Sequence, residues 1–389
     1  MTPRRTTGTY VTTSTVGEEV RAFVPSPLPP EPPLEMTLDL LDLLERANRS
    51  LGRVDGLAEA LPEVSHLLYM YVRKEAVLSS QIEGTQSSLA DLLLYESELV
   101  PGVPLDDVLE VSLYVAAVEH GLKRMAEGFP LSLRLLREIH AVLLQRGRGS
   151  AFTPGDFRTS QNWIGGARPG DARFVPPPPE RLVECLGALE LFLHDKPVRM
   201  PLLLKAAMAH VQFETIHPFL DGNGRMGRLL ITLLLCAERA LSLSQPILYL
   251  SLYFKTHQQE YYDRLDKVRT EGDWEGWVRF FLEGVRETSN GVVTTARAIQ
   301  TLFQEDEARI LQLGRRSASV LRVYRKLQQK PVASIPETHQ ALDLSFPTVS
   351  KAFRELENLG IAREITGKER DRAYAYDQYL KALAAGTTG

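Results

Sequence analysis

Residues 217–228 read HPFLDGNGRMGR, and this stretch decides which fold and which site the rest of the chain must support. One helical pattern ends near Glu214 and another begins near Gly224, so the sequence predicts a tight loop between two helices. Glycine has no Cβ, which lets backbone N–H groups converge on one point, and a helix N-terminus attracts negative charge. The stretch therefore predicts an anion site at the start of the second helix.

Two arginines indicate what kind of anion this is. Arg225 and Arg228 lie three residues apart in the first turn, so we expect them to share a face. The helix dipole disfavours arginine near an N-terminus, and a bound polyanion would relieve that cost. Two guanidiniums beside a backbone anion site favour a polyphosphate over a carboxylate.

Three other residues of the loop predict its chemistry. Asp221 is the only acid near the expected phosphates, which suits Mg²⁺. His217 stands where a neutral imidazole can accept a hydroxyl proton near pH 7. We expect Phe219 to anchor the loop in the core. A histidine before proline is usually structural and Gly-Asn-Gly is usually only a turn, but their combination with an acid and two arginines favours the functional interpretation.

The stretch resembles the signature of the Fic family, histidine-x-phenylalanine-x-acid-glycine-asparagine-glycine-arginine-x-x-arginine, at every defining position. The resemblance extends over the helices from about Leu38 to Gly284. It implies an all-helical core and transfer of AMP from ATP to Ser, Thr or Tyr hydroxyls of target proteins, the enzyme itself included. Doc-like relatives that phosphorylate carry a bulkier residue in place of Gly222, so the intact glycine favours AMP transfer. Phosphocholine transfer is the minority interpretation.

The resemblance also implies a role for each residue. His217 would be the base, and Asp221 would bind Mg²⁺ or Mn²⁺. The arginines would bind the β- and γ-phosphates, and a tyrosine after the apolar run ILYLSLYF would line the adenine pocket, although packing explains both tyrosines equally well. The residues implied to bind ATP are Gly222, Asn223, Gly224, Arg225, Gly227, Arg228, Tyr261 and Tyr262.

A second motif, SSQIEG from Ser79, ends an apolar helix at Gly84, a natural terminator. Glu83 stands in the last turn, where the dipole disfavours a carboxylate, and shares a face with Ser79. The motif resembles the Fic inhibitory motif, Ser/Thr-x-x-x-Glu-Gly/Asn. That resemblance implies that Glu83 pairs with Arg228 and blocks placement of the γ-phosphate; a solvent-exposed glutamate is the alternative. As a further hypothesis, Glu83 orients water that removes AMP from a modified protein.

We expect a mainly all-α fold in four parts. A proline-rich arm over residues 1–36 precedes an N-terminal helical region with the inhibitory helix, residues 37–104, and a Fic core, residues 105–298. Prolines favour an extended arm, which Val20, Phe23, Val24 and Leu28 would anchor to the surface. Residues 299–389 resemble a winged helix-turn-helix domain.

Residues 157–180, within the core, read FRTSQNWIGGARPGDARFVPPPPE and predict a β-hairpin with a glycine-rich tip. The segment resembles the Fic flap. Ile164 and Gly165 are expected to align the backbone of a target protein by strand addition. Such a flap would recognise backbone more than sequence.

The C-terminal segment supports an alternative function, a DNA-binding transcriptional regulator. Residues 315–381 hold 13 Lys or Arg against 8 Asp or Glu. Helices are predicted at 318–329, 338–342 and 347–359, followed by a strand pair. The expected DNA face comprises Ser345, Thr348, Ser350, Lys351 and Arg354 on the third helix, with Lys368, Arg370 and Arg372 on the wing. Glu355, Glu357 and Asp371 dilute this face, so contact with protein alone is equally well supported.

Composition, cysteine content and apolar runs narrow the classes of protein to which this chain can belong. The net charge of −4 argues against a generally basic nucleic-acid binder. Cys185 and Cys236 lie in separate helical patterns, which argues against a disulfide framework and favours a reducing cytoplasm. The N-terminus lacks the apolar run of a signal peptide, and the run LLITLLLCA is too short to span a membrane. We expect a cytoplasmic protein with no membrane contact, and the resemblance favours a homodimer.

Overall fold

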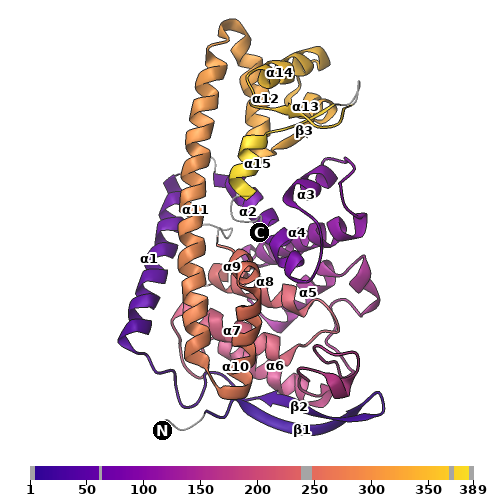
Figure 1. The fold of residues 1–389 in the computed structure, drawn as a ribbon, viewed down its shortest axis with the longest axis vertical. Coiled ribbons are helices and arrows are strands. Elements are labelled where there is room, and N and C mark those ends of the chain that lie inside the picture. The colour runs from indigo at the N-terminus through magenta and orange to yellow at the C-terminus, as the bar shows by residue number, and fades with distance from the viewer. Residues whose placement is uncertain (1–4, 61–63, 238–247, 368–371, 385–389) are drawn as a thin grey trace.

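The computed structural model describes residues 5–60, 64–237, 248–367 and 372–384 and confirms a mainly helical fold (Figure 1). The N-terminal part contains β1 (Gly8–Thr15), β2 (Glu18–Pro25), α1 (Leu38–Ala60), α2 (Val64–Ile82) and α3 (Leu89–Glu96). The central part contains α4 (Leu105–Ala126), α5 (Leu133–Leu143), η1 (Arg148–Ala151), η2 (Pro169–Asp171), α6 (Pro179–Leu193), α7 (Leu202–Ile216), α8 (Asn223–Ala237), α9 (Ser251–Thr256) and α10 (Gln258–Glu271). The remainder contains α11 (Trp274–Leu311), η3 (Gly314–Arg316), α12 (Ser317–Gln329), β3 (Val332–Ser334), α13 (Ile335–Leu342), α14 (Phe346–Asn358), β4 (Arg363–Glu364), β5 (Ala373–Ala375) and α15 (Asp377–Ala384).

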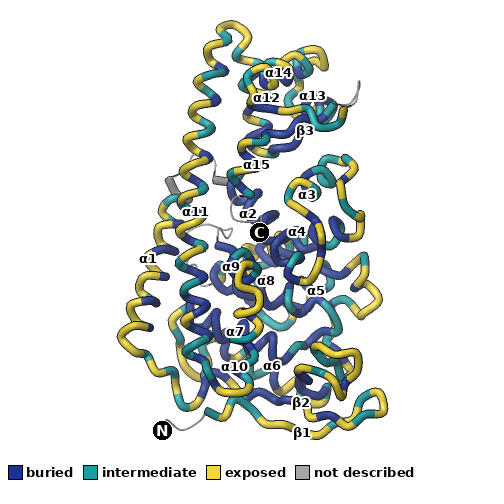
Figure 2. The backbone as a smooth tube through the Cα atoms, viewed as in Figure 1, coloured by how far each residue is buried: buried dark blue, intermediate teal, exposed yellow. Residues whose placement is uncertain are grey.

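Helices α7 and α8 form the centre of the core, on either side of the 217–222 loop. Every α7 residue from Leu203 to Ile216 is buried, and α8 is buried from Arg225 to Leu235 (Figure 2). A helix buried on all sides belongs inside a protein. Trp277 of α11 is fully buried and donates its indole N–H to the Ala207 carbonyl at 2.9 Å, which ties α11 to α7. The loop therefore connects two helices that the core holds in place.

Helix α2 is the second central element. Its residues from Tyr71 to Ser80 are all buried, and it packs against α3, α4, α8, α9 and α15. Gly84, with φ of 98°, ends the helix as predicted. The side chain of Gln81 donates to the Ser87 carbonyl, and Gln258 donates to the Ile82 carbonyl, so the end of α2 is held from two sides.

The N-terminal arm contains a β-hairpin that the sequence did not predict. β1 and β2 pair antiparallel from Gly8↔Pro25 to Thr15↔Glu18. Val16 and Gly17, both with positive φ, form the two-residue turn that such hairpins favour. The threonine-rich β1 lacks the alternation of apolar and polar residues that predicts a strand, so no sequence pattern indicated the hairpin. The four predicted anchors, Val20, Phe23, Val24 and Leu28, are buried as expected.

The predicted flap has less strand structure than its sequence indicated. One bridge, Ile164↔Phe174, closes residues 157–180, and turns with the short η2 helix occupy the tip. Strand β2 supplies the missing support, because the Phe23 N–H donates to the Val175 carbonyl at 2.9 Å. Glu18 accepts a hydrogen bond from the Gly170 N–H at 2.8 Å, which fixes the tip.

The C-terminal unit comprises α12, α13, α14 and a sheet of order β3-β5-β4, and α11 connects it to the main body (Figure 1). The three predicted helices occur as α12, α13 and α14. Ser334 caps α13, which begins three residues before its predicted start. The predicted boundary at 298–299 falls within α11, and Lys368 and Arg370 of the predicted wing lie outside the described residues. In the part of the chain that the structure describes, no helix has the length and apolar character needed to cross a bilayer.

Candidate active site

His217 is the C-cap of α7 and adopts a left-handed conformation, with φ of 49°. This conformation is uncommon for a residue with a side chain, so the surrounding contacts must maintain it. Arg158, at the base of the flap, donates its Nε–H to the His217 carbonyl at 2.9 Å. The Arg158 backbone N–H donates to the Pro218 carbonyl at 2.9 Å. Arg158 is itself buried, and it holds the backbone that presents the histidine.

The loop after His217 is closed by a reciprocal pair of hydrogen bonds. The Phe219 N–H donates to Asn223 Oδ1 at 2.9 Å, and Asn223 Nδ2 donates to the Phe219 carbonyl at 2.8 Å. Phe219 is fully buried and stacks on His140 with ring centroids 3.7 Å apart, so the predicted anchoring is confirmed. We call these two bonds the Phe219–Asn223 bracket; they hold the Asn223 side chain, while its backbone N–H can face an anion.

The electrostatic surroundings of His217 favour the neutral imidazole. Burial of the ring, together with the positive charges of Arg269 and Arg158, lowers the pKa of His217 to about 3. Its Nδ1 is buried and has no hydrogen-bond partner. A neutral imidazole can accept a proton from a hydroxyl across the physiological pH range.

The start of α8 has the geometry of an anion site. Gly222 has φ of 76°, a conformation that strains any residue with a Cβ, and its N–H donates to Asp221 Oδ1 at 2.6 Å. The first N–H groups of a helix have no intrahelical acceptor. A Cβ on Gly224 would collide with the carboxylate of Glu83, so this carboxylate lies directly against the first turn of the helix. The anion in this structure is therefore a side chain of the protein itself.

Arg228 joins that carboxylate to the end of α2. Its guanidinium donates to Ser79 Oγ at 2.8 Å, to the Ser79 carbonyl at 2.9 Å and to Glu83 Oε1 at 2.6 Å. We call this set of contacts the Arg228 clamp. Arg228 is buried, whereas the Glu83 side chain is 40% exposed. Burial acts to lower the pKa of Arg228, but Glu83, Tyr261 and Glu214 together outweigh it and the pKa is raised.

Arg225 points in another direction. It lies 3.6 Å from Glu110 Oε1 of α4, and its Nε and Nη1 have no hydrogen-bond partner although both are buried. Arg148 shares the same glutamate at 3.2 Å. Thus the two arginines flank the start of α8 from different sides, and Arg225 keeps donors free for a ligand.

Asp221 is the one carboxylate of the loop. One oxygen accepts the Gly222 N–H, while a Cβ on Gly149 would approach the other to 2.8 Å. Among the described residues there is no group of three or more metal-ligating side chains. A single carboxylate nevertheless fits Mg²⁺, which commonly binds one or two carboxylates together with substrate phosphates.

Two buried glutamates surround the Arg228 clamp, and sequence patterns gave no sign of either. Glu214 of α7 is 7% exposed, its Oε1 has no partner, and burial raises its pKa to about 7. Glu75 of α2 accepts hydrogen bonds from Ser251, and burial raises its pKa to about 7 as well. A folded-state pKa above the unfolded value means that each group favours folding below pH 4.5 and loses that contribution as the pH rises through 7.

The remaining predicted residues occupy different environments. Tyr261 is buried and its hydroxyl bonds to His210 Nε2 at 2.9 Å, so packing explains it. His210 Nδ1 lies 2.9 Å from the carbonyl of Gly227, which fixes that part of α8. Tyr262 is 36% exposed. The adenine contact of Tyr261 or Tyr262 stays a prediction, and Tyr262 is the more exposed of the two.

In the flap, the backbone of Ile164 pairs inward with Phe174, and the exposed Gly165 follows it at the edge. Besides Glu75, sequence analysis missed two residues of the site, Arg158 and Glu214. Each stands alone in its segment, without a spacing that singles it out. Only the contacts of Arg158 with the His217 loop, and the burial of Glu214, indicate their importance.

Comparison with known proteins shows which family models and relatives this chain matches. The Fic/DOC family N-terminal model matches residues 41–123, and the Fic/DOC family model matches residues 130–235. "Protein adenylyltransferase Fic" of Aedes aegypti is 32% identical over 265 residues, covering 65% of this chain and 49% of that protein. Its namesake in Culex quinquefasciatus is 30% identical over 249 residues, covering 63% and 46%. The chain spans about half the length of the curated relatives it matches.

A solved structure agrees in fold. The crystal structure of a Fic family protein from Desulfovibrio desulfuricans G20 superposes with a TM-score of 0.57 at 20% identity, covering 88% of this chain and 97% of that chain.

We expect the imidazole of His217 to stay neutral between pH 5.5 and 8. Its lowered pKa means that protonation occurs only below this window, whereas an unperturbed histidine titrates near 6.5. NMR titration of protein with ¹³C-labelled histidine measures this directly, and His217→Gln assigns the resonance. A His217 signal that shifts with a midpoint near pH 6.5 would contradict the environment described here.

Proposed function

The chain carries a Fic/DOC family N-terminal region followed by a Fic/DOC family domain, and from this premise we propose that it is a protein adenylyltransferase held inactive by its own Glu83. In this proposal it moves AMP from ATP to a Ser, Thr or Tyr hydroxyl of a target protein, and also to itself. Relatives named protein adenylyltransferase support the reaction, and such an activity requires protein targets.

One observation carries the proposal: an anion site at the start of α8 that is filled by an inhibitory carboxylate. Glu83 lies against Gly224 and binds Arg228 at 2.6 Å. A site that accommodates a carboxylate between a helix N-terminus and an arginine also suits a phosphate group. Gly227 completes the turn, because the buried carboxylate of Glu214 leaves no space for a Cβ there.

The residues support a direct displacement at the α-phosphorus. Neutral His217 removes the proton from the target hydroxyl as its oxygen forms a bond to the α-phosphorus. The bond from this phosphorus to the β-phosphate oxygen breaks, and pyrophosphate leaves with the electron pair. Arg225 and Arg228, with the backbone N–H groups of Asn223 and Gly224, stabilise the negative charge on the phosphates. Gly165 and its neighbours at the flap edge align the target backbone.

Mg²⁺ or Mn²⁺ fits this arrangement as a cofactor. Asp221 would hold the ion together with phosphate oxygens of ATP. When bound, the ion would supply neutralisation of phosphate charge.

The Arg228 clamp inhibits in two ways. It occupies the donors of Arg228, and it places a negative charge where the γ-phosphate would lie. Repulsion between two unit charges about 4 Å apart costs roughly 1 kcal/mol in water and roughly 4 kcal/mol at an effective dielectric of 20. Glu83 is 40% exposed and so falls between these limits. Removing its carboxylate should accelerate transfer roughly five- to a thousand-fold, since about 1.4 kcal/mol corresponds to a factor of ten.

Labelling with ATP radioactive at the α-phosphate tests the proposal. In the presence of Mg²⁺ we expect weak self-labelling of the wild type, strong labelling of Glu83→Gly and none of Glu83→Gly with His217→Ala. Glu98→Gly is the matched control, because Glu98 has a positive φ that glycine tolerates and lies outside the clamp. Its labelling should equal that of the wild type.

The alternatives give different results. Transfer of label only from the γ-phosphate would indicate a kinase. Absence of transfer from either position, to the protein itself or to a cell lysate, would refute the adenylyltransferase and favour phosphocholine transfer.

The same glutamate supports the reverse activity as a second part of the proposal. A carboxylate beside the α-phosphate can orient water for removal of AMP. We expect unlabelled wild type to release AMP from the labelled Glu83→Gly protein, and Glu83→Gln to release none. Equal release by both enzymes would exclude Glu83 from this reaction. Release by neither would exclude the reaction itself.

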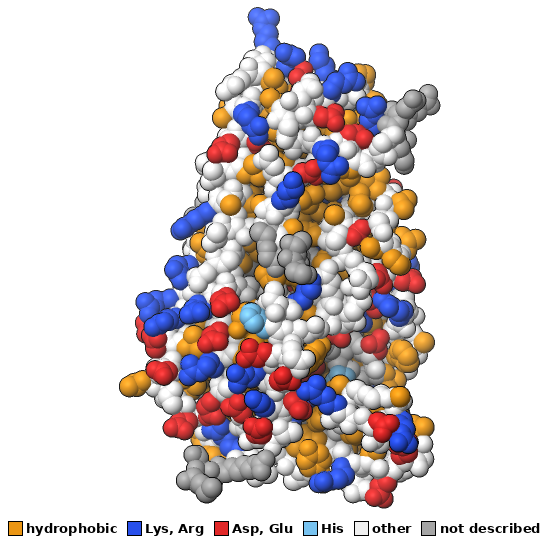
Figure 3. All heavy atoms as spheres, in the orientation of Figure 1, with side chains coloured by type: hydrophobic (Ala, Val, Ile, Leu, Met, Phe, Trp, Pro, Cys, Tyr) orange, Lys and Arg blue, Asp and Glu red, His pale blue; other side chains and the backbone are white. Residues whose placement is uncertain are grey.

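DNA binding by the C-terminal unit is a second candidate function, which the comparisons do not favour as the main one. Ser345, Lys351 and Arg354 of the predicted face are exposed on or next to α14, and α12–α14 with the three-stranded sheet follow the order of a winged helix. Figure 3 shows Lys and Arg side chains over this unit at the top of the view, with acidic ones among them.

A gel shift with genomic fragments tests this role. We expect binding that weakens with salt, and Lys351→Ala with Arg354→Ala should reduce the salt slope by about one unit per lost phosphate contact. Lys267→Ala, an exposed lysine on α10, is the control. Binding that is absent or insensitive to salt would leave the unit without a DNA role.

We further propose a cytoplasmic location and a homodimer. Both cysteines, Cys185 and Cys236, are free, which supports a reducing compartment. The homodimer rests on the family resemblance.

A further inference from the structure

The hairpin of β1 and β2 lies against the flap, at the bottom of the view in Figure 1. The Phe23 N–H of β2 donates to the Val175 carbonyl at 2.9 Å. Within the flap, the backbone of Ile164 exchanges two hydrogen bonds with Phe174, at 2.8 and 3.1 Å. The hairpin therefore supports one side of the flap, and a target strand would add at the opposite edge, residues 163–165.

A small apolar cluster seals the junction between the hairpin and the flap. Its members come from both segments: Val11, Val20 and Ala22 of the hairpin, and Trp163, Ala172 and Val175 of the flap. The ring of Phe23 also lies 6.1 Å from the ring of Phe174. Apolar contacts hold two segments together without fixing their direction. The polar contacts at the junction therefore decide how the flap is placed.

Glu18 makes the polar contact at the tip of the flap. Its Oε2 accepts the Gly170 N–H at 2.8 Å, and its Oε1 lies 3.5 Å from Arg168 Nη1. A Cβ on Gly170 would come within 2.5 Å of the same carboxylate, so the carboxylate lies directly against the backbone of the tip. Glu18 is the first residue of β2, and its pairing with Thr15 holds its own backbone in place.

The tip of the flap is packed too closely to absorb a displacement of Gly170. A Cβ on Gly166 would lie 2.4 Å from the carbonyl oxygen of Asp171. A Cβ on Gly165 would lie 3.1 Å from the Cβ of Arg173. These short approaches connect the two sides of the tip, so a shift of Gly170 moves Gly165 at the edge expected to align a target.

The other end of the hairpin is attached to the helices beside His217. Gln212 of α7 donates its side-chain N–H to the carbonyl of Ser26, directly after β2, at 2.9 Å. The hydroxyl of Thr7, directly before β1, donates to the Arg269 carbonyl of α10 at 2.8 Å. His217 is the C-cap of α7. The hairpin therefore reaches from the helix that carries His217 to the tip of the flap.

We propose that Glu18 is a positioning residue for the protein target, because it fixes the flap edge relative to His217. Arg158 attaches the base of the flap to the His217 loop, and Glu18 attaches the tip. A target hydroxyl must lie within hydrogen-bond reach of its base, and a displacement of about 1 Å can cost roughly a hundredfold in rate. ATP binds at the start of α8 in the proposed function, on which this inference rests. Glu18 therefore affects transfer to protein and not the binding of ATP.

The test compares two acceptors of AMP in the Glu83→Gly background. Transfer to protein is read as label on the chain from ATP radioactive at the α-phosphate. Transfer to water is read as free AMP, and it requires no alignment of a target backbone. Adding Glu18→Ala should reduce the label on protein about tenfold, the effect of losing one hydrogen bond to a charged group. The release of AMP to water and the KM for ATP should stay unchanged.

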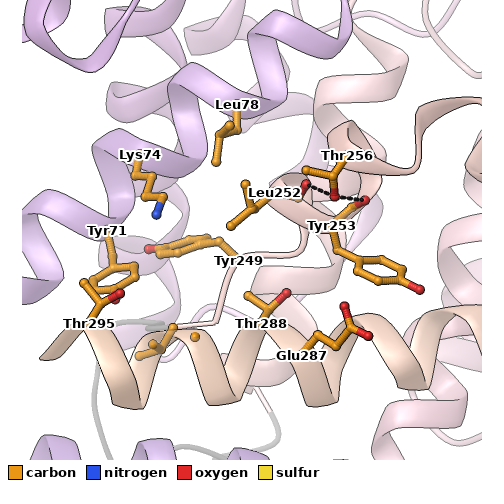
Figure 4. Close-up of a pocket in the computed structure, with 12 residues that line it drawn as sticks. Tyr71, Lys74, Leu78, Tyr249, Leu252, Tyr253, Thr256, Glu287, Thr288 and Thr295 are labelled. Carbon is orange, nitrogen blue, oxygen red and sulfur yellow. Dashed lines mark hydrogen bonds between the residues drawn. The ribbon is translucent and has the colours of Figure 1, made fainter. Parts of the chain in front are cut away.

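Three control variants separate the lost acceptor from general damage. Glu18→Gln keeps an acceptor oxygen with the same reach and should retain the label within about threefold. Glu19→Ala removes the neighbouring exposed glutamate of β2 and should label as its parent does. Thr288→Ala changes the wall of a cavity of about 270 Å³ between α2, α9 and α11 (Figure 4). The described residues that line this cavity lie outside the hairpin and the flap, so the label should not change.

Hydrogen–deuterium exchange reports on the flap without any reaction. In Glu18→Ala, residues 163–175 should exchange faster than in the wild type, while exchange in α7 should not change. Unchanged label or unchanged exchange in Glu18→Ala would overturn the proposal. An equal fall in protein label and in AMP release would also overturn it, because that result indicates damage to the whole site. If Glu83→Gly yields neither label nor AMP, the proposed function fails, and the exchange still decides whether the hairpin holds the flap.

Discussion

The contact between Arg228 and the end of α2 is the interaction on which the organisation of this protein depends. One buried guanidinium binds Ser79 through side chain and backbone and binds Glu83 through its carboxylate. A buried arginine needs such partners, because an uncompensated charge in the interior is strongly destabilising. The same donors are required for the phosphates of ATP in the proposed reaction. In that proposal, inhibition and substrate binding compete for one residue.

This competition works only because both sides of the clamp are held firmly. Helices α7 and α8 are buried on all sides, and the Phe219–Asn223 bracket fixes the loop between them. Helix α2 is equally buried, and Glu75 binds Ser251 at the start of α9. The two Ser79 contacts of the clamp, one of them with the backbone, can therefore part only if α2 or Arg228 moves. Any group that contacts α2 can change how easily the helix moves.

Burial determines the protonation states of several ionisable groups around the site. His217, His210 and His140 have pKa values lowered mainly by burial, so all three are neutral at pH 7. The free energy of unfolding falls as the pH drops below about 6.5, because these histidines take up protons in the unfolded chain but not in the folded one. The raised pKa values of Glu75 and Glu214 act in the opposite direction. Their opposition limits the pH dependence of stability while His217 stays neutral at pH 7.

The sequence by itself determined the helical fold class, the loop at residues 217–228, the end of α2 at Gly84 and the burial of Phe219. These features follow from local rules, since helical periodicity, glycine conformation and spacing within one turn act over a few residues. Pairing of Glu83 with Arg228 was predicted through the family resemblance, and the structure confirms that contact. Only the tertiary structure decided what lies around the site. Three contacts join segments that are distant in the chain: Arg158 with His217, Glu214 with Gly227, and β2 with the flap. A local sequence pattern does not predict such contacts, because burial and long-range packing arise only when the whole chain is folded.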